Sequence, residues 1–424
     1  TPKPSSAASD VYKRQSFFRG RYCRWRWLRL QLTQLRALEL KSRKSTSLIA
    51  LSTTALALPG IAISDSPPPQ STASYKISNY SEDDLDRSES PYGDLERYDI
   101  DVHQFKLISP AGRNLSFSLD ANHETMSGAS PWYTSSGSDG EPLVAMSGAS
   151  GIYDERTEVS VGASYYLNQG TVSGVVGYSE ENDYRAKYYA LSASRNFNDE
   201  LTTLSIGYSY SADDIFPTDA DVFNRVTGER KNSKSSVVSI SQIISQNSTF
   251  QLSLNISEQS GFLSDPYKLR DVRPEDKTQI AVTNSYRHFF RDSNSALHVN
   301  YRYYHDDFGI SSHTIDSSWH KNIGGILRIV PNIRYYSQSA ANFFTNIDDF
   351  MKPLNEYQSS DYRLSSFGAL SGGIDFIFNF GRWSTVLSAE RYVASDNFPS
   401  FSVNRPSAAL VKFNRFSIVL EYNF

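Results

Sequence analysis

The sequence has little of several features that usually define a protein class. Its 424 residues contain a single cysteine, Cys23, so disulfides and cysteine-ligated metal sites are excluded for the rest of the chain. Methionine is scarce, at three residues, and none precedes Met126. The formal net charge is only −4, which provides no electrostatic footprint for nucleic acid.

Long apolar runs are also missing. Hydrophobic residues make up 39% of the chain, and the mean hydropathy is −0.46. Outside the apolar run at 48–58, no stretch approaches the ~18 apolar residues of a membrane-spanning helix. Membrane strands are not excluded, because a barrel strand exposes only every second side chain to lipid. Aromatic residues, in contrast, are abundant: 27 Tyr, 24 Phe and 5 Trp suit the aromatic girdles of a membrane barrel.

The clearest pattern lies in the last nine residues. Phe416, Ile418, Leu420, Tyr422 and Phe424 alternate with other side chains, which predicts a strand with one apolar face. This segment resembles the terminal strand of bacterial outer-membrane β-barrels, which carries the signal read by the barrel-insertion machinery. The alternative is an edge strand of a soluble sheet.

The same alternation recurs along the chain, and the connections alternate in length. Short turns are predicted at Pro110–Asn114, Asn168–Gly170, Asn198–Glu200, Gln246–Ser248, Arg291–Asn294, Lys321–Gly324 and Gly381–Arg382. Longer polar loops are predicted at 123–155, 211–233, 259–276, 337–361 and 395–411, with short outer connections only at 181–184 and 306–310. Short turns on one side and long loops on the other are typical of outer-membrane barrels.

The sequence therefore predicts an all-β, transmembrane, antiparallel up-and-down barrel of about 16 strands, with short periplasmic turns and long extracellular loops. Seven short turns and two periplasmic termini require a first strand near 74–82, where the pattern is weak. Pro331 lies inside a strand pattern, and we expect a β-bulge there.

The N-terminal region divides into three parts before the barrel at 75–424. Arg43 and Lys44 precede a short apolar run and small residues, which predicts a secretory signal over 44–62, cleaved near Ala62; the alternative is a retained anchor. Residues 1–43 begin with a string typical of translated adapter sequence and are interpreted as non-native; the alternative is a basic extension. Residues 63–74 are predicted to be a flexible mature N-terminus.

Several strings, in this order, resemble the domain of unknown function 3570 family of bacterial outer-membrane barrels. They include Tyr153–Arg156, Glu180–Tyr184, Leu263–Lys268, Tyr301–Tyr304 and Ser360–Leu364. The resemblance covers about 75–424 and implies a barrel of unassigned function. Its members are often encoded near a flavin-transferring enzyme, a thioredoxin-like protein and a small lipoprotein, which implies an envelope lipoprotein or redox protein as a partner.

The main candidate site is a charged inner wall on the strands of 278–336. If Ile280, Val299 and Ile329 face lipid, the opposite register turns seven polar side chains inward: Arg287, His298, Arg302, Asp316, His320, Arg328 and Arg334. They are interpreted either as a selectivity wall for anions or as an internal charge lattice. The strands of 157–257 turn mainly Ser, Gly, Asn and Thr inward. Asp213, Asp214, Asp219 and Asp221 are interpreted as a solvated acidic loop, because their spacing lacks a calcium-loop motif.

The leading functional prediction is a porin-like or substrate-specific channel in the outer membrane of a Gram-negative bacterium. The alternatives are a non-conducting scaffold or export partner for a lipoprotein or redox system, and a barrel enzyme. No cofactor, metal or catalytic site is predicted. The expected partners are outer-membrane lipid and lipopolysaccharide and the barrel-insertion machinery, and no nucleic acid.

Overall fold

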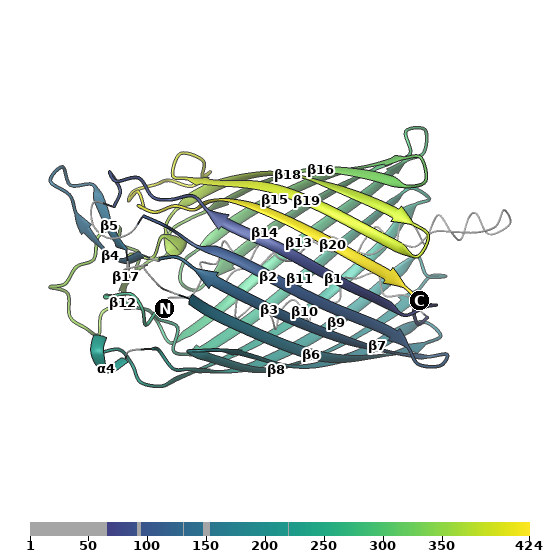
Figure 1. Cartoon of the computed structure of the whole chain (residues 1–424), viewed down its shortest axis with the longest axis horizontal. Helices are drawn as coiled ribbons and strands as arrows, with labels where there is room; N and C mark the ends of the chain where they lie inside the picture. The colour runs from purple at the N-terminus through teal and green to yellow at the C-terminus, as the bar shows by residue number, and fades with distance from the viewer. Residues whose placement is uncertain (1–65, 91–94, 130, 147–152, 219) are drawn as a thin grey trace.

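The computed structural model describes residues 66–90, 95–129, 131–146, 153–218 and 220–424. It contains one closed barrel in which sixteen antiparallel strands pair in chain order and β20 returns to β1 (Figure 1). The predicted fold class and strand count are confirmed. The proposed non-native segment 1–43, the signal 44–62 and its cleavage point Ala62 lie outside the described residues.

The barrel strands have the following bounds: β1 (Thr72–Glu82), β2 (Asp99–Pro110), β3 (Leu115–Ser127), β6 (Tyr153–Leu167), β7 (Gly170–Glu181), β8 (Tyr184–Phe197), β9 (Thr202–Ile215), β10 (Glu229–Ser245), β11 (Ser248–Gly261), β13 (Asp276–Phe290), β14 (Ser295–Asp306), β15 (Ser311–Ile323), β16 (Leu327–Gln338), β18 (Phe367–Phe380), β19 (Trp383–Ser395) and β20 (Lys412–Asn423). The first strand begins at Thr72, inside the segment expected to be flexible.

The alternating sequence explains why these segments form a two-faced wall. On β10, Val238 and Ile240 are exposed, whereas their neighbours Ser239 and Ser241 are buried. Successive side chains of a strand point to opposite faces, so the exposed apolar set lies on the outside of the barrel. A closed barrel satisfies its backbone hydrogen bonds internally and can present this apolar surface to lipid.

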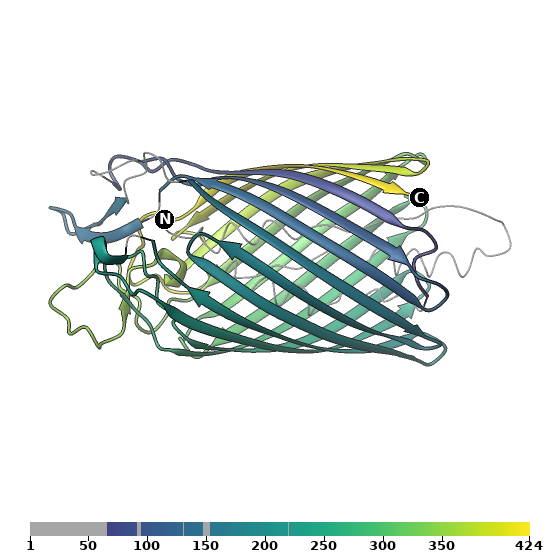
Figure 2. The same ribbon diagram turned by 60° about the horizontal axis from the view of Figure 1, so that its bottom comes forward.

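The two ends of the barrel differ, as the connection lengths predicted. The seven short turns lie at the end where the chain terminates, and the long connections lie at the other end (Figures 1 and 2). The turn after β15 is the one placed wrongly: β15 continues to Ile323, so the turn is 324–326.

The bulge expected at Pro331 is also wrong. Ser318 pairs with Asn332 and Lys321 pairs with Ile329 in the same register. Proline has no N–H to donate, so the ladder between β15 and β16 is interrupted at this point while its register is kept.

The long connections are more structured than polar loops. Two short sheets form there, from β4 (Pro131–Ser136) with β5 (Pro142–Met146) and from β12 (Asp271–Val272) with β17 (Gln358–Ser359). The helix α4 (Ala220–Phe223) and the 3-10 turn η1 (Tyr362–Leu364) complete this end. None of the helices in the described ranges is long and apolar enough to cross a membrane.

Candidate functional site: the barrel interior and its outer mouth

The seven charged and histidine side chains of the candidate wall lie on the strand face opposite the exposed apolar residues. On β14, for example, Tyr301 and Tyr303 are exposed and His298 is buried. Arg287, His320 and Arg334 are buried in the same way on β13, β15 and β16, while Arg302, Asp316 and Arg328 are half-buried.

The contacts divide these side chains into groups with different roles. Arg287 donates from Nη1 to the backbone carbonyls of Tyr286 at 3.0 Å and Val299 at 3.2 Å, so it is tied to the wall itself. Asp316 and Arg334 occupy paired positions on β15 and β16. The guanidinium of Arg302 lies 5.5 Å from the ring centroid of Tyr304.

The histidines form the closest pair in this wall. The ring centroids of His298 and His320 are 4.0 Å apart, and the Ser318 hydroxyl lies 3.0 Å from His320 Nε2. A serine nucleophile would need a histidine that is in turn oriented by an acid. The His320 ring lies against a second imidazole, that of His298, and Asp316 takes the register position opposite Arg334. The two imidazoles and Ser318 therefore form part of the inner wall.

The other side of the interior carries small polar side chains. The inward positions of β6, β7, β9, β10 and β11 are mainly serine, and include Ser160, Ser205, Ser209, Ser239 and Ser253. Small side chains occupy little of the lumen, so the barrel interior is less filled on this side.

The closing strand completes the barrel in the expected register. Ile418 pairs with Ile77 of β1, and Leu420 pairs with Tyr75. Phe416, Ile418, Leu420 and Phe424 are exposed on the outer face, and the ring of Tyr422 stacks on that of Phe424 at 5.9 Å. On the inner face, Arg415 binds Glu390 of β19 at 2.9 Å.

At the outer mouth, residues 358–366 fold inward; we call them the mouth segment. Tyr362 joins a buried cluster with Tyr80, Ile100, Met126 and Phe413 of β1, β2, β3 and β20. Leu364, only two residues later, joins a second cluster on β13, β14 and the connection after β14, with Ala281, Tyr304 and Phe308. The mouth segment thus connects two separate parts of the inner wall.

Ion pairs hold the mouth segment in place. Asp361 accepts from Arg363 Nε at 2.7 Å and from Arg273 Nη2 at 2.7 Å. Arg363 also binds Asp265 at 3.0 Å, and Arg273 binds Asp271 at 2.8 Å. Burial alone would raise the pKa of Asp361, but Arg363 and Arg273 outweigh it and hold the pKa well below its ordinary value. We call these five residues the Asp361 cluster.

A hydrogen-bond network links the mouth segment to the other outer elements. Gln338, at the end of β16, donates from Nε2 to the carbonyls of Arg363 at 3.0 Å and Ser365 at 2.6 Å. Asp348 Oδ2 accepts from Ser360 Oγ at 3.0 Å and from the backbone N–H of Thr134 on β4 at 2.7 Å. The outer connections therefore form one interlocked cap around the mouth.

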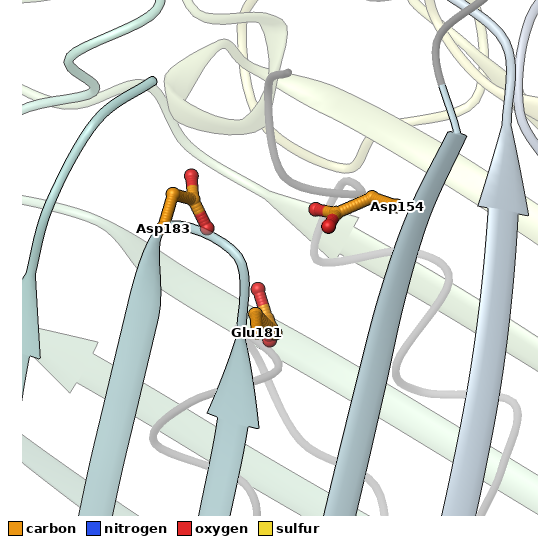
Figure 3. Close-up of side chains that lie close together, drawn as sticks. All are labelled: Asp154, Glu181 and Asp183. Carbon is orange, nitrogen blue, oxygen red and sulfur yellow. The ribbon is translucent and has the colours of Figure 1, made fainter.

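A group of carboxylates that the sequence analysis missed lies at the rim of the barrel. Asp154, Glu181 and Asp183 come from the start of β6, the end of β7 and the connection between β7 and β8, and one ligand atom of each lies within 4.8 Å of the others (Figure 3). Two of the strings on which the family resemblance rests contain these residues. Those two strings were the signal in the sequence that could have located this group, although the spacing of their acidic residues is not that of a metal-ligand motif.

The solvated acidic loop expected at 211–233 is shorter in the structure, because strands extend into it from both sides. β9 extends to Ile215 and β10 begins at Glu229, so Asp213 and Asp214 are strand residues on opposite faces. Asp213 binds Lys231 at 3.3 Å, and Asp214 binds Arg230 at 3.3 Å. Asp219 lies outside the described residues, and Asp221 lies in α4.

The closed barrel, its apolar outer face and its asymmetric ends define the class: a transmembrane β-barrel of the outer-membrane type. The family model described as "Protein of unknown function (DUF3570)" matches residues 48–400, and the chain belongs to this family.

Comparisons with other proteins add the following. No curated protein matches the chain. Among solved structures, it is similar to the siderophore receptor PirA from Pseudomonas aeruginosa, with a TM-score of 0.43 and 11% identity over 83% of this chain and 62% of that receptor. It is also similar to OpdQ from Pseudomonas aeruginosa, with a TM-score of 0.40 and 10% identity over 85% of this chain and 99% of OpdQ.

A third similar structure is a BenF-like porin from Pseudomonas fluorescens Pf-5, with a TM-score of 0.41 and 10% identity. The match covers 85% of this chain and 99% of the porin. CdiB from Acinetobacter baumannii has a TM-score of 0.47 and 8% identity, and this chain spans 60% of its length.

Proposed function

We propose that this barrel is a channel of the outer membrane that passes small polar solutes, with a preference for anions, through a mouth narrowed by its own outer connections. One observation carries the proposal: sixteen strands close into a barrel whose inner face is polar. Barrels of about this size enclose more space than their own inward side chains fill, which leaves an aqueous lumen.

The preference for anions rests on the arginines of the charged wall. Arg334 takes the register position opposite the acidic Asp316, and Arg287 is held against the wall by its bonds to backbone carbonyls. Arg302 lies over the Tyr304 ring, and Arg328 donates from Nε to Asn322 at 2.7 Å, so both guanidinium groups carry their positive charge on the inner face. Arg302 and Arg328 are therefore our candidates for residues that set ion selectivity.

The channel is tested with the purified full-length chain in a planar lipid bilayer. We expect discrete conductance steps and a reversal potential in a salt gradient that favours anions. The double variant with Arg302→Ala and Arg328→Ala should keep the steps and shift the reversal potential toward cations. Arg185→Ala is the matched control, because Arg185 is paired with Glu180 at the exposed outer rim.

Two results would contradict parts of this proposal. Unchanged reversal potentials in the double variant would mean that the charged wall does not select ions and is instead an internal lattice that supports the barrel. The absence of conductance, in the wild type and in a variant with an opened mouth such as Arg363→Ala, would reject the channel.

One observation favours a non-conducting scaffold or docking role as the second candidate. Phe350, Met351, Leu354 and Tyr357 expose apolar side chains at the tip of the connection between β16 and β18, and Met351 is 92% exposed. Such a tip fits contact with another envelope component. A barrel without conductance would make this the leading function.

Delivery to the membrane is part of the same proposal. We propose that a secretory signal at 44–62 is removed near Ala62 and that the apolar face of Phe416, Ile418, Leu420, Tyr422 and Phe424 is read by the barrel-insertion machinery. N-terminal sequencing of the membrane-extracted protein tests the first step, since a chain starting near residue 63 is expected.

A further inference from the structure

We propose that Asp154, Glu181 and Asp183 form a binding site for a divalent cation of the calcium type at the outer rim of the barrel. This site is independent of whether the barrel conducts. It lies where β6 begins and β7 turns into β8 (Figure 3), and Tyr267 of the connection that follows β11 contacts Asp183.

The spacing of the three carboxylates fits one ion. Their ligand atoms all lie within 4.8 Å of one another. Calcium binds oxygen at about 2.3–2.6 Å, so two ligands of one ion are at most about 5 Å apart. Magnesium binds at about 2.0–2.1 Å and requires its ligands to be closer, within about 4 Å. Separations of up to 4.8 Å can be spanned by one calcium ion without movement of the backbone.

A second observation points to a missing ligand at Asp183. This side chain is 1% exposed, and its Oδ2 accepts from the Tyr267 hydroxyl. Its other oxygen, Oδ1, is buried and has no hydrogen-bond partner among the described residues. Figure 3 shows the carboxylate turned toward Asp154 and Glu181. A buried carboxylate oxygen without a partner is costly, and a cation would satisfy it.

The local charge balance favours a cation as well. Arg156 is shared among Glu158 at 2.6 Å, Glu124 at 3.7 Å and Glu181 at 3.7 Å. Through Glu181, Asp154 and Asp183 adjoin this group, so the connected set holds five carboxylates and one guanidinium. A divalent ion would reduce the excess negative charge.

Two of the ligands are held in place by their neighbours. Asp154 Oδ1 accepts from the backbone N–H of Glu155 at 3.0 Å and from Asn182 Nδ2 at 2.9 Å. The backbone carbonyl of Asp183 accepts from the N–H of Phe216 at 2.7 Å. Preorganised ligands lose less conformational freedom when an ion binds.

The site also explains why three of the family strings meet at one place. Tyr153–Arg156 supplies Asp154, Glu180–Tyr184 supplies Glu181 and Asp183, and Leu263–Lys268 supplies Tyr267. Through Tyr267, a bound ion would fix the connection between β11 and β13 against the rim.

Calcium titration of the purified full-length protein, after treatment with a chelator, tests the site by isothermal calorimetry. We expect one saturable site per chain, with an affinity of about 0.1–1 mM or tighter and weaker binding of Mg²⁺. Tb³⁺ luminescence excited through tyrosine should report the same site, because Tyr267 contacts Asp183.

The variants Asp183→Asn and Glu181→Gln should each weaken calcium binding by tenfold or more. Glu180→Gln is the matched control: this acid precedes Glu181 on β7 but pairs with Arg185 at the exposed surface, so its loss should leave binding unchanged. Heat-dependent gel mobility verifies that each variant is folded. The proposal is overturned if the folded wild type shows no saturable calcium binding, or if Asp183→Asn binds as well as the wild type.

Discussion

At the scale of single residues, Gly177 shows how the inner wall depends on a missing side chain. A Cβ at Gly177 would lie 2.2 Å from the ring of Tyr188 on β8. The ring occupies that space because its hydroxyl donates to Glu158 on β6 at 2.6 Å. Glycine on β7 therefore permits a contact that spans three strands.

We predict that Gly177→Ala displaces Tyr188 and destabilises the barrel by about 1–3 kcal/mol. Urea unfolding followed by tryptophan fluorescence measures the change. Gly174→Ala is the control, because the nearest atom to its Cβ is the end of the Leu191 side chain at 3.3 Å. Equal destabilisation by the two variants would contradict the role of Tyr188.

Asp361 gives the outer mouth a dependence on pH. Its pKa is lowered in the folded protein: burial opposes the ionised form, but Arg363 and Arg273 stabilise it more strongly. A lowered pKa contributes stability above the ordinary aspartate pKa of about 3.9, and this contribution is lost as pH falls below that value. Asp271, Asp265 and Lys268 face the same cluster.

We therefore predict that the mouth segment loosens below about pH 4 and is held firmly at neutral pH. A spin label at Leu354, which is 81% exposed, should gain mobility on acidification. Asp348 opposes this trend, because burial raises its pKa. In Asp361→Asn, the label should be mobile both at neutral pH and below about pH 4. A pH response as large as that of the wild type would rule out Asp361 as the titrating group.

At the scale of the strand, the two faces have opposite tolerances. Leu254 and Ser253 are neighbours on β11, the first exposed on the outer face and the second buried on the inner face. An arginine facing lipid near the midplane costs about 2–4 kcal/mol. An arginine facing the lumen is solvated.

We predict that Leu254→Arg lowers the yield of folded barrel, measured by heat-dependent gel mobility. Ser253→Arg should fold in normal yield and reduce conductance by partly filling the lumen. The reverse order of folding yields would mean that the two faces have been exchanged.

The strands were predictable because each one encodes its own pattern. Alternation and turn residues are local, so they identified the sixteen strands and six of the seven short turns. Elements set by distant partners were not predicted. The hairpin β4–β5 and the pairing of β12 with β17 depend on contacts between connections far apart in the chain.

The same limit applies to the candidate site. A strand's period of two allowed the seven wall residues to be assigned to one face once Ile280 was placed outside. It did not reveal that Arg287 binds backbone or that His298 meets His320, because both depend on side-chain conformations across neighbouring strands. The carboxylate trio was missed for a related reason: Asp154 lies far in sequence from Asp183.

At the scale of the whole molecule, the mouth segment is held across the outer end of the barrel by its ion pairs and its two buried clusters. Removing the guanidinium of Arg363 leaves Asp361 with Arg273 alone and breaks the contact with Asp265. Loss of one partner of a buried ion pair costs about 3–5 kcal/mol, which favours release of the segment.

We predict that Arg363→Ala raises single-channel conductance above that of the wild type while heat-dependent gel mobility is unchanged. Lys352→Ala is the control, since Lys352 pairs with Glu356 at the exposed tip of the same connection. A conductance equal to that of the wild type would mean that the mouth segment does not limit the flow.

The place where Tyr362 binds has a consequence for the order of assembly. Its cluster combines Tyr80 of β1 with Phe413 of β20, the first and last strands of the barrel. These two side chains come together only when the two edges of the sheet have joined. In an unfinished sheet the Tyr362 cluster therefore lacks its β20 side, and it is complete only after the barrel has closed. The mouth segment would thus also stabilise the pairing of β1 with β20 from the inner face of the barrel and oppose its reopening.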